Sequence, residues 1–221
     1  MCGIAGVINL NYKLVDEKSI RRMIKVIKHR GPDDEGYFVD NNIGLGHCRL
    51  SIIDLSKAGH QPMADKDKSL WIVYNGEVYN FLEIRRELER IGYRFKSNSD
   101  AEVILYSYKE WGERCVDRFN GMWAFAIWDK KRKELFCSRD RFGIKPFYYF
   151  FDGKTFAFAS EIKSLLELDI LREPNEVLIY DFLKFGILDH TNETFFKSIK
   201  KLSAASWLKI KQDGTAVIKK Y

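Results

Sequence analysis

The amino-acid sequence predicts an α+β sandwich in a single domain. Segments with the composition of β-strands fall into two blocks, and helical patterns lie between and after these blocks. With 221 residues, of which 46% are hydrophobic, the chain has enough apolar side chains for a substantial core. No Gly/Ser-rich linker, low-complexity tract or internal repeat divides the sequence.

The beginning of the chain predicts a strand, a helix and further strands. Residues 4–8 are apolar and rich in β-branched side chains, as in a strand. Residues 18–30 place apolar side chains at helical spacing and end at Gly31-Pro32, which predicts a helix. Further strands are expected at 37–40, 43–53 and 70–74, the last of which is a continuous apolar run typical of a buried strand.

Two capping patterns predict the next two helices. Asn80 precedes Glu83, and Ser99 precedes Glu102, at the spacing of a capping box, in which two side chains satisfy the free backbone N–H groups of a helix start. Apolar residues at helical spacing follow both patterns. The predicted helices cover 80–91 and run from Ser99 to about Gly112.

The second half of the chain predicts strands, two helices and a hairpin. The strands are expected at 122–129, 134–139, 147–151 and 155–159. The helices are expected at 161–168 and 174–185, the second with Pro174 in its first turn and Gly186 as its stop. Residues 206–211 and 215–221 flank Asp213-Gly214, a pair that favours tight turns.

Composition excludes several classes of protein. No apolar run approaches the ~18 residues of a membrane span, and no secretory signal is recognisable. These features predict a cytoplasmic protein with no membrane partner. The four cysteines lack the close pairing of a zinc site. The net charge of +6 comes from basic residues interleaved with 31 acidic ones, so we expect a solvated surface and no nucleic-acid partner.

Cys2 is the first candidate for catalysis. If Met1 is removed, Cys2 becomes the amino-terminal residue and carries a thiol and an α-amine together. The thiolate is a nucleophile, and the amine, with an ordinary pKa near ~8, can accept the thiol proton directly or through a water molecule. The alternative is that Cys2 is an ordinary residue at the start of a strand.

Four compact motifs contain further candidates, at 29–34, 49–54, 74–80 and 99–102. Each motif also has a structural explanation. Asn75-Gly76 between apolar runs is a strong hairpin signal. Ser99 and Asp100 fit a helix cap, and Arg49 fits a surface charge. Taken singly, the motifs therefore favour structural roles.

In this order and together with Cys2, the motifs resemble the amino-terminal glutaminase domain of glutamine-hydrolysing asparagine synthetase. That family is a class II glutamine amidotransferase with the amino-terminal-nucleophile hydrolase fold. The segments 119–126, 139–149 and 159–165 extend the resemblance over nearly the whole chain. It implies one glutaminase domain over residues 1–221 and a four-layer αββα sandwich, with two antiparallel sheets packed face to face between helices.

The resemblance also implies a mechanism and a set of site residues. Cys2 would attack the carboxamide of glutamine, with its α-amine as base, and would form a γ-glutamyl thioester that water hydrolyses. Asn75 and Gly76 would donate to the oxyanion. Arg49 would bind the substrate carboxylate, and Asp100 and Glu77 its ammonium group. The backbone around Leu50 and Ile53 would complete the pocket, and Arg30 would shape a loop near the site.

The chain lacks the Ser-, Gly- and Asp-rich ATP-pyrophosphatase loop of the family's synthetase half. We therefore expect ATP and magnesium only in a synthetase domain absent from this chain, and no cofactor or metal in this one. The expected partners are glutamine and that synthetase domain, on the same longer chain or in a partner subunit. A homodimer is compatible with the pattern.

Two functional alternatives stay open. Relatives also amidate sugars or other carboxylates, so the ammonia acceptor need not be the aspartate of asparagine synthesis. The chain could instead be a regulatory domain that binds glutamine without hydrolysing it.

Overall fold

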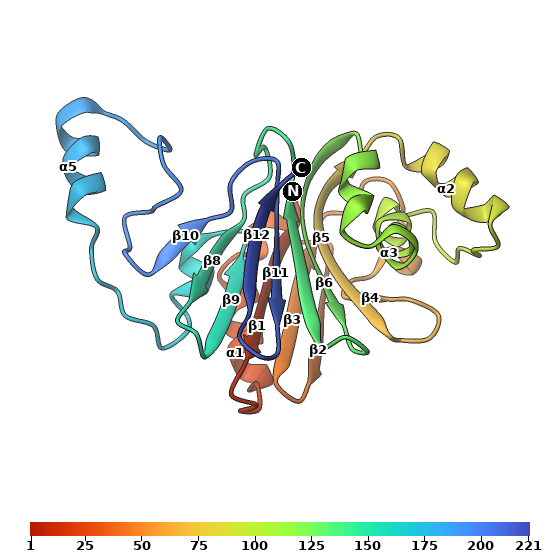
Figure 1. Cartoon of the computed structure of the whole chain (residues 1–221), viewed down its shortest axis with the longest axis horizontal. Coiled ribbons are helices and arrows are strands. Elements are labelled where there is room, and N and C mark those ends of the chain that lie inside the picture. The colour runs from red at the N-terminus through yellow and green to blue at the C-terminus, as the bar shows by residue number, and fades with distance from the viewer.

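The computed structural model describes all 221 residues and contains two six-stranded antiparallel sheets (Figure 1). The strand order of the first sheet is β10 (Ile199–Lys201), β8 (Tyr148–Phe151), β9 (Thr155–Ala159), β1 (Gly3–Asn9), β3 (Ile43–Arg49) and β2 (Asp34–Asp40). The order of the second sheet is β12 (Ala216–Lys220), β11 (Ser206–Lys211), β7 (Glu134–Arg139), β6 (Gly121–Asp129), β5 (Leu70–Val78) and β4 (Met63–Ala64).

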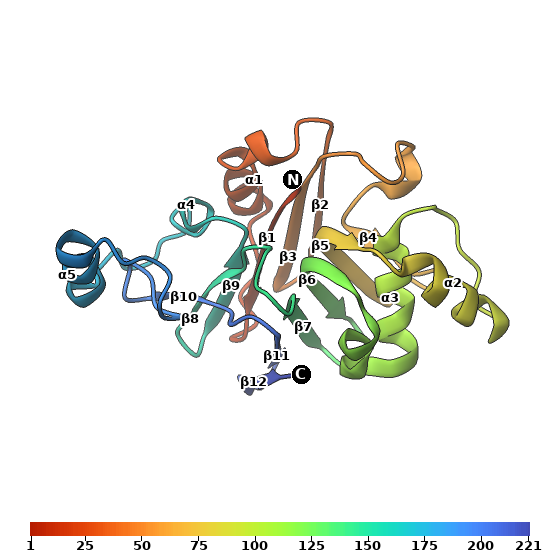
Figure 2. The ribbon, with the colours of Figure 1, turned by 90° about the horizontal axis from the view of Figure 1, so that it is seen from above.

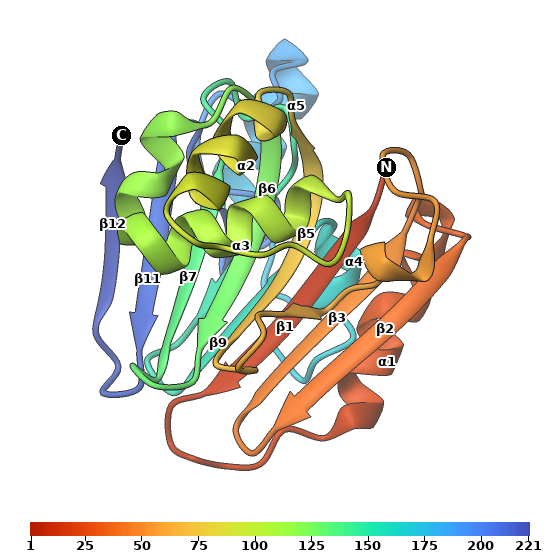
Figure 3. The same cartoon turned by 90° about the vertical axis from the view of Figure 1, so that its right-hand side faces the viewer.

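Helices cover the outer faces of both sheets. In Figure 2, α1 (Glu17–Lys25) and α4 (Ile162–Leu165) lie on the side of the first sheet. Figure 3 shows α2 (Phe81–Arg90) and α3 (Asp100–Trp111) lying across the second sheet. A fifth helix, α5 (Glu176–Phe185), stands away from both sheets. Short 3-10 turns occupy Lys28–Arg30, Lys57–Gly59 and Gly112–Arg118. The predicted four-layer αββα sandwich is therefore confirmed.

Three apolar layers follow from the alternation of side chains along the strands. On β1, Ile4 and Ile8 face the space between the sheets, whereas Ala5 and Val7 face α1. On β5, Val73 joins the layer between the sheets, and its neighbours face α2 and α3. Each sheet thus buries both of its faces, which explains why so many strand residues are apolar.

The division of the strands between the two sheets differs from their grouping in the sequence. The sequence places the strands in an early and a late block, but neither block forms a sheet of its own. Instead, the first sheet joins β1–β3 to β8–β10, and the second joins β4–β7 to β11 and β12. The reason is that strand pairing depends on contacts between distant residues, which local sequence patterns do not contain.

Several predicted element boundaries also change. The helix expected at 18–30 ends at Lys25 and is followed by a separate 3-10 turn, and the strand expected at 43–53 ends at Arg49. The helix expected at 161–168 is only the single turn α4. Pro174 lies before the start of α5, because Asn175 caps that helix and Pro174 pairs with Phe196.

The two predicted capping boxes have different outcomes. Ser99 caps α3, because its side chain accepts a hydrogen bond from the N–H of Ala101. The box itself does not form: Glu102 accepts from the N–H groups of Lys96 and Ser97 and not from that of Ser99. Asn80 does not cap α2 with its side chain. Its amide instead donates to the carbonyl of Arg118 and accepts from the N–H of Asn120, so it ties the start of α2 to the segment before β6.

The helices are too short or too polar for a membrane span. None of them combines the length and the hydropathy that crossing a bilayer would require.

Candidate active site

The candidate site is a pocket at the ends of β1, β3 and β5, closed by the start of α3. All eight predicted site residues line it: Cys2, Arg49, Leu50, Ile53, Asn75, Gly76, Glu77 and Asp100. Strand pairing explains part of this convergence. Gly3 of β1 lies opposite Cys48 of β3, which places Cys2 beside the chain that follows Arg49.

The Cys2 thiol lies next to the backbone of Leu50. The Leu50 N–H donates to Sγ at 3.4 Å, and Sγ lies 3.6 Å from the Leu50 carbonyl oxygen. Burial raises the pKa of the thiol above its ordinary value. The Leu50 hydrogen bond, the amino-terminal charge and Arg49 oppose this shift, and the charge of Asp100 adds to it.

Asn75 and Gly76 do not form the hairpin turn that their sequence predicts. They lie within β5, opposite Ala124 and Trp123 of β6. Gly76 is needed there because β6 approaches closely: a Cβ at this position would lie 2.2 Å from the Met122 carbonyl oxygen. The pair is therefore part of a rigid strand that borders the pocket.

This part of β5 offers two hydrogen-bond donors on its side away from β6. Asn75 is 1% exposed, and its Nδ2 has no hydrogen-bond partner. The N–H groups of Tyr74 and Val78 point away from β6, to Gln61 at 2.7 Å and Asp100 at 3.0 Å. Because alternate residues of a strand direct their N–H groups to the same side, the Gly76 N–H leaves β5 on this edge as well.

Arg49 is a buried cation at the end of β3. Its guanidinium donates to the carbonyl of Ser56 at 2.9 Å and to the carbonyl of Asp54. Gly59 allows this position, because a Cβ there would lie 2.2 Å from Arg49 Nη2. A guanidinium has five N–H groups, so these two bonds leave further donors for an anion.

Asp100 is the first residue of α3 and is buried. Its Oδ2 accepts hydrogen bonds from the Tyr74 hydroxyl at 2.7 Å and the Val78 N–H at 3.0 Å. Burial raises the pKa of this carboxyl, and the two hydrogen bonds partly oppose the shift. The pocket thus holds an anionic group on one side and Arg49 on another.

Comparison with known proteins decides the family. Residues 1–221 match the family described as the glutamine amidotransferase domain. The chain belongs to this family.

Its relatives support the predicted resemblance to glutamine-hydrolysing asparagine synthetases. This amidotransferase domain is 43% identical to the putative asparagine synthetase (glutamine-hydrolyzing) 2 of Methanocaldococcus jannaschii, over 100% of the chain and 46% of that protein. It is 41% identical to asparagine synthetase (glutamine-hydrolyzing) 3 of Bacillus subtilis, over 97% of the chain and 35% of the relative. The chain therefore spans less than half the length of these relatives.

A solved structure confirms the fold. The glutamine phosphoribosylpyrophosphate amidotransferase from B. subtilis superposes with a TM-score of 0.71 over 99% of this amidotransferase domain and 49% of that chain, at 16% sequence identity. The predicted amino-terminal-nucleophile hydrolase fold is confirmed by this likeness and by the two packed sheets.

Arg30, which was expected to shape a loop near the site, lies next to the nucleophile residue itself. Its Nε donates to the carbonyl of Cys2 at 3.0 Å, and its Nη1 pairs with Glu161 Oε1 at 3.0 Å. Burial raises the pKa of Glu161, but hydrogen bonds from Arg30, Lys163 and His29 outweigh it and hold that pKa below its ordinary value. The ionised Glu161 thus anchors Arg30, which fixes the backbone of Cys2.

The structure adds residues to the pocket that the sequence did not suggest. Gln61, Tyr74 and Lys145 line it together with the predicted set. Lys145 is 5% exposed, and burial together with the charge of Arg30 lowers its pKa. The segment 139–149 had been singled out, but nothing in its sequence indicated that Lys145 lines the same pocket as Cys2. No group of three or more His, Cys, Asp or Glu side chains is arranged to hold a metal ion.

Proposed function

We propose that this amidotransferase domain hydrolyses glutamine to glutamate and ammonia, with Cys2 as the nucleophile. The observation that carries the proposal is the convergence, in one pocket, of a thiol, two donors on β5, a buried guanidinium and a buried carboxyl. This set matches the needs of a small zwitterionic amide: a nucleophile, an oxyanion site and an anchor for each charged end.

The reaction begins after Met1 has been removed. The α-amine of Cys2 accepts the thiol proton, and Sγ bonds to the carboxamide carbon of glutamine to give a tetrahedral oxyanion. The oxyanion collapses, the C–N bond breaks, and the ammonium returns its proton to the leaving nitrogen, which departs as ammonia. Water then adds to the γ-glutamyl thioester while the α-amine accepts its proton, the C–S bond breaks, glutamate is released, and the proton passes to the thiolate to regenerate the thiol.

The remaining residues act on the charges of the substrate and the transition state. Asn75 Nδ2 and the Gly76 N–H donate to the oxyanion, and Arg49 binds the α-carboxylate. Asp100, whose bonds to Tyr74 and Val78 both end on Oδ2, offers Oδ1 to the α-ammonium group, and Glu77 assists it. The backbone at Leu50 and Ile53 closes the pocket.

We further propose that the ammonia is consumed by a synthetase domain that makes asparagine from aspartate in the cytoplasm. The names of the longer relatives support this assignment. ATP and magnesium would act in that second domain, and glutamine hydrolysis itself would need no cofactor. A related acceptor, such as a sugar, is the alternative for the second reaction.

Incubation with glutamine tests the hydrolysis. Protein shown by mass spectrometry to begin at Cys2 is expected to release glutamate, whereas Cys2→Ala protein and protein that retains Met1 are expected to be inactive. Retained Met1 blocks the reaction because it converts the base into an amide. Calorimetric binding of glutamine without glutamate release from correctly processed protein would instead identify a non-catalytic glutamine-binding domain.

A further inference from the structure

The helix α5 is the most apolar exposed element of the molecule. Seven of its ten residues are apolar or aromatic, and only Leu178 is buried. Figures 1 and 2 show it standing away from both sheets. Nine of the 21 large hydrophobic residues that are exposed lie within residues 171–195, a segment that makes up about a ninth of the chain. Exposed apolar groups are thus concentrated here, which is typical of an interaction surface.

The backbone holds α5 at its base. The Asn175 N–H donates to the Phe195 carbonyl at 2.8 Å, and the Lys197 N–H donates to the Glu173 carbonyl at 3.0 Å. Asp181 pairs with His190 at 3.1 Å. These bonds connect α5 to the returning segment 187–197, so its place is set by ordered structure.

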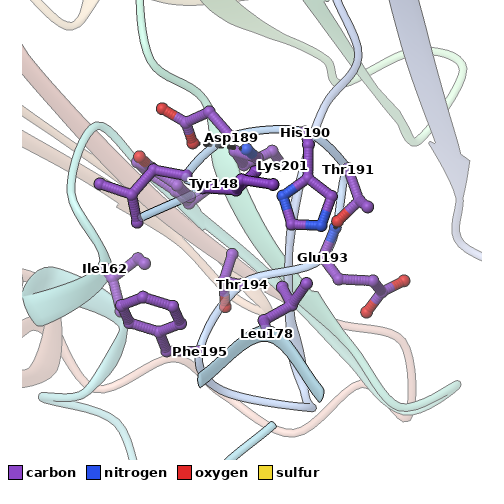
Figure 4. A pocket seen from close by; sticks show the side chains of 12 residues that line it. Tyr148, Ile162, Leu178, Asp189, His190, Thr191, Glu193, Thr194, Phe195 and Lys201 are labelled. Atoms are coloured by element: carbon purple, nitrogen blue, oxygen red, sulfur yellow. Dashed lines mark hydrogen bonds and ion pairs between the residues drawn. The ribbon is translucent and has the colours of Figure 1, made fainter. Parts of the chain in front are cut away.

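The packing beneath the helix is incomplete. Figure 4 shows a cavity between Leu178 of α5, Ile162 of α4 and Phe195 of the returning segment, with Tyr148 on its other side. Ile187 and Leu188 also line this cavity and are 42% and 57% exposed. A helix that is apolar on most sides is normally buried on most sides. The α5 surface, which we define as Val177, Tyr180, Leu183, Phe185 and Leu188, therefore lacks a cover.

We infer that the α5 surface is the docking site for the synthetase part of the longer chain. This inference rests on the proposed function, which supplies that partner. The domain corresponds to 46% and 35% of the two relatives described above, so more than half of each relative lies outside the matched region. A covalently linked partner also acts at a high effective concentration, which suits a permanently apolar surface.

Charge argues against an anionic membrane as the cover. Apart from its apolar residues, α5 carries Glu176, Asp181 and Lys184, so acidic groups outnumber basic ones. Helices that lie on anionic lipid surfaces have polar faces rich in Lys and Arg. An apolar protein surface is the partner that fits α5.

Hydrogen–deuterium exchange tests the assignment. Exchange would be compared between the 221-residue protein and the longer chain that carries the synthetase part. The amides of residues 176–188 are expected to exchange at least ~10-fold more slowly in the longer chain, as for a helix that becomes buried. Equal exchange in the two proteins would overturn the inference.

Two variants in the longer chain sharpen the test. Leu183→Glu alters a residue that is 77% exposed and is expected to restore fast exchange in α5 and to lower glutamine-dependent synthesis relative to ammonia-dependent synthesis. Leu14→Glu, at a site 70% exposed between β1 and α1, is the matched control and is expected to change neither. Identical behaviour of the two variants would contradict the inference.

Further outcomes separate other covers from the proposed one. Light scattering that shows a dimer of the 221-residue protein, dissociated by Leu183→Glu, would assign α5 to a second copy instead. Flotation with phosphatidylcholine–phosphatidylglycerol vesicles would assign it to lipid. Glutamate release is measured separately, so protection of α5 without hydrolysis would leave the docking site standing while the proposed function fails.

Discussion

At the residue scale, the side chain of Asn75 is a buried donor without an acceptor. Leaving such a group unpaired costs about 1–3 kcal/mol, so the fold keeps it at the expense of stability. Asn75 lines the pocket of Cys2, where an oxyanion would supply the acceptor that Nδ2 lacks. A donor that is idle in the free protein and used in the transition state raises the rate without strengthening ground-state binding.

Asn75→Ala is therefore expected to lower kcat by ~10²–10³ without lowering the melting temperature, because the substitution also removes the unpaired donor. Steady-state glutaminase kinetics and thermal unfolding measure the two effects. A variant that retains its kcat would show that the Asn75 amide does not contact the oxyanion.

Lys145 provides a second prediction at this scale. It lines the pocket of Cys2, where the other charged or titratable groups are the amino terminus, Arg49, Asp54, Tyr74, Glu77 and Asp100. A positive charge near a thiol favours the thiolate. Lys145→Met is therefore expected to raise the pH at which Cys2 becomes reactive.

The rate of iodoacetamide alkylation as a function of pH measures this shift. The other three cysteines are buried and should react slowly, so mass spectrometry can follow Cys2 alone. Lys13→Met, at an exposed site, is the control. Superimposable pH profiles for the Lys145 variant and the unsubstituted protein would show that Lys145 does not influence the ionisation of Cys2.

At the scale of elements, β5 can position Asn75 and Gly76 because the strand runs through them without a turn. In a hairpin turn, Asn75 and Gly76 would not be held by a neighbouring strand. Pairing with β6 instead fixes their backbone at the border of the pocket that contains Cys2. The close approach of β6 leaves no space for a side chain at Gly76, since a Cβ would also lie 2.7 Å from Trp123 Cα. Both neighbours are backbone atoms, so relief would require a shift of the strands.

Gly76→Ala is expected to destabilise the protein by about 1–3 kcal/mol, as overpacking does, and to abolish most glutamate release. Gly92→Ala is the control, because Gly92 has a positive φ but open space around it. That control should cost about 1–2 kcal/mol, because alanine is strained at a positive φ, and should leave the activity intact. Urea unfolding measures the stability of the two variants, and the glutamate assay measures their activity. Equal losses of glutamate release in both variants would refute the role of the contact between Gly76 and β6.

At the scale of the whole molecule, His47 links the two sheets. It lies on β3 with no exposed surface, and its Nε2 is 3.1 Å from the carbonyl oxygen of Tyr74 on β5. Because a carbonyl only accepts, Nε2 carries the proton of the neutral ring. Burial lowers the pKa of His47 to about 3, although the bond to Tyr74 opposes the shift.

The sign of the resulting pH dependence follows from that shift. The unfolded chain takes up a proton on His47 near pH 6.5, whereas the folded protein does so only near 3. The contribution of neutral His47 to the free energy of unfolding is therefore fully present above pH 6.5 and is lost as the pH falls toward 3. The loss is at most about 5 kcal/mol, at roughly 1.36 kcal/mol per pH unit.

His47→Gln is expected to flatten the fall in unfolding free energy between pH 6.5 and 4, because glutamine can donate to Tyr74 but does not titrate in this range. Urea unfolding at a series of pH values measures the slope. His190→Gln, at a residue outside the core, is the control and should leave the slope of the unfolding free energy against pH unchanged. An unchanged slope for the His47 variant would assign the acid sensitivity to other groups.

Local sequence patterns determined most of the elements and the chemistry of the site. Hydrophobic periodicity located α2, α3, α5 and most strands, because side-chain burial imposes a repeat that a short window reveals. The resemblance carried by the ordered motifs implied eight site residues, and the structure brings all eight to one pocket. The two-residue β4 and three-residue β10 escaped prediction, because segments so short carry no readable period.

Only the tertiary structure decided how these parts combine. It assigned β5 to the second sheet, kept Asn75-Gly76 inside that strand, and turned the Asn80 side chain toward Asn120. It also brought Lys145 into the wall of the Cys2 pocket and left α5 uncovered. The physical reason is the same in each case. Contacts between residues far apart in the chain outweigh local preferences of about 1 kcal/mol, and a sequence window does not contain them.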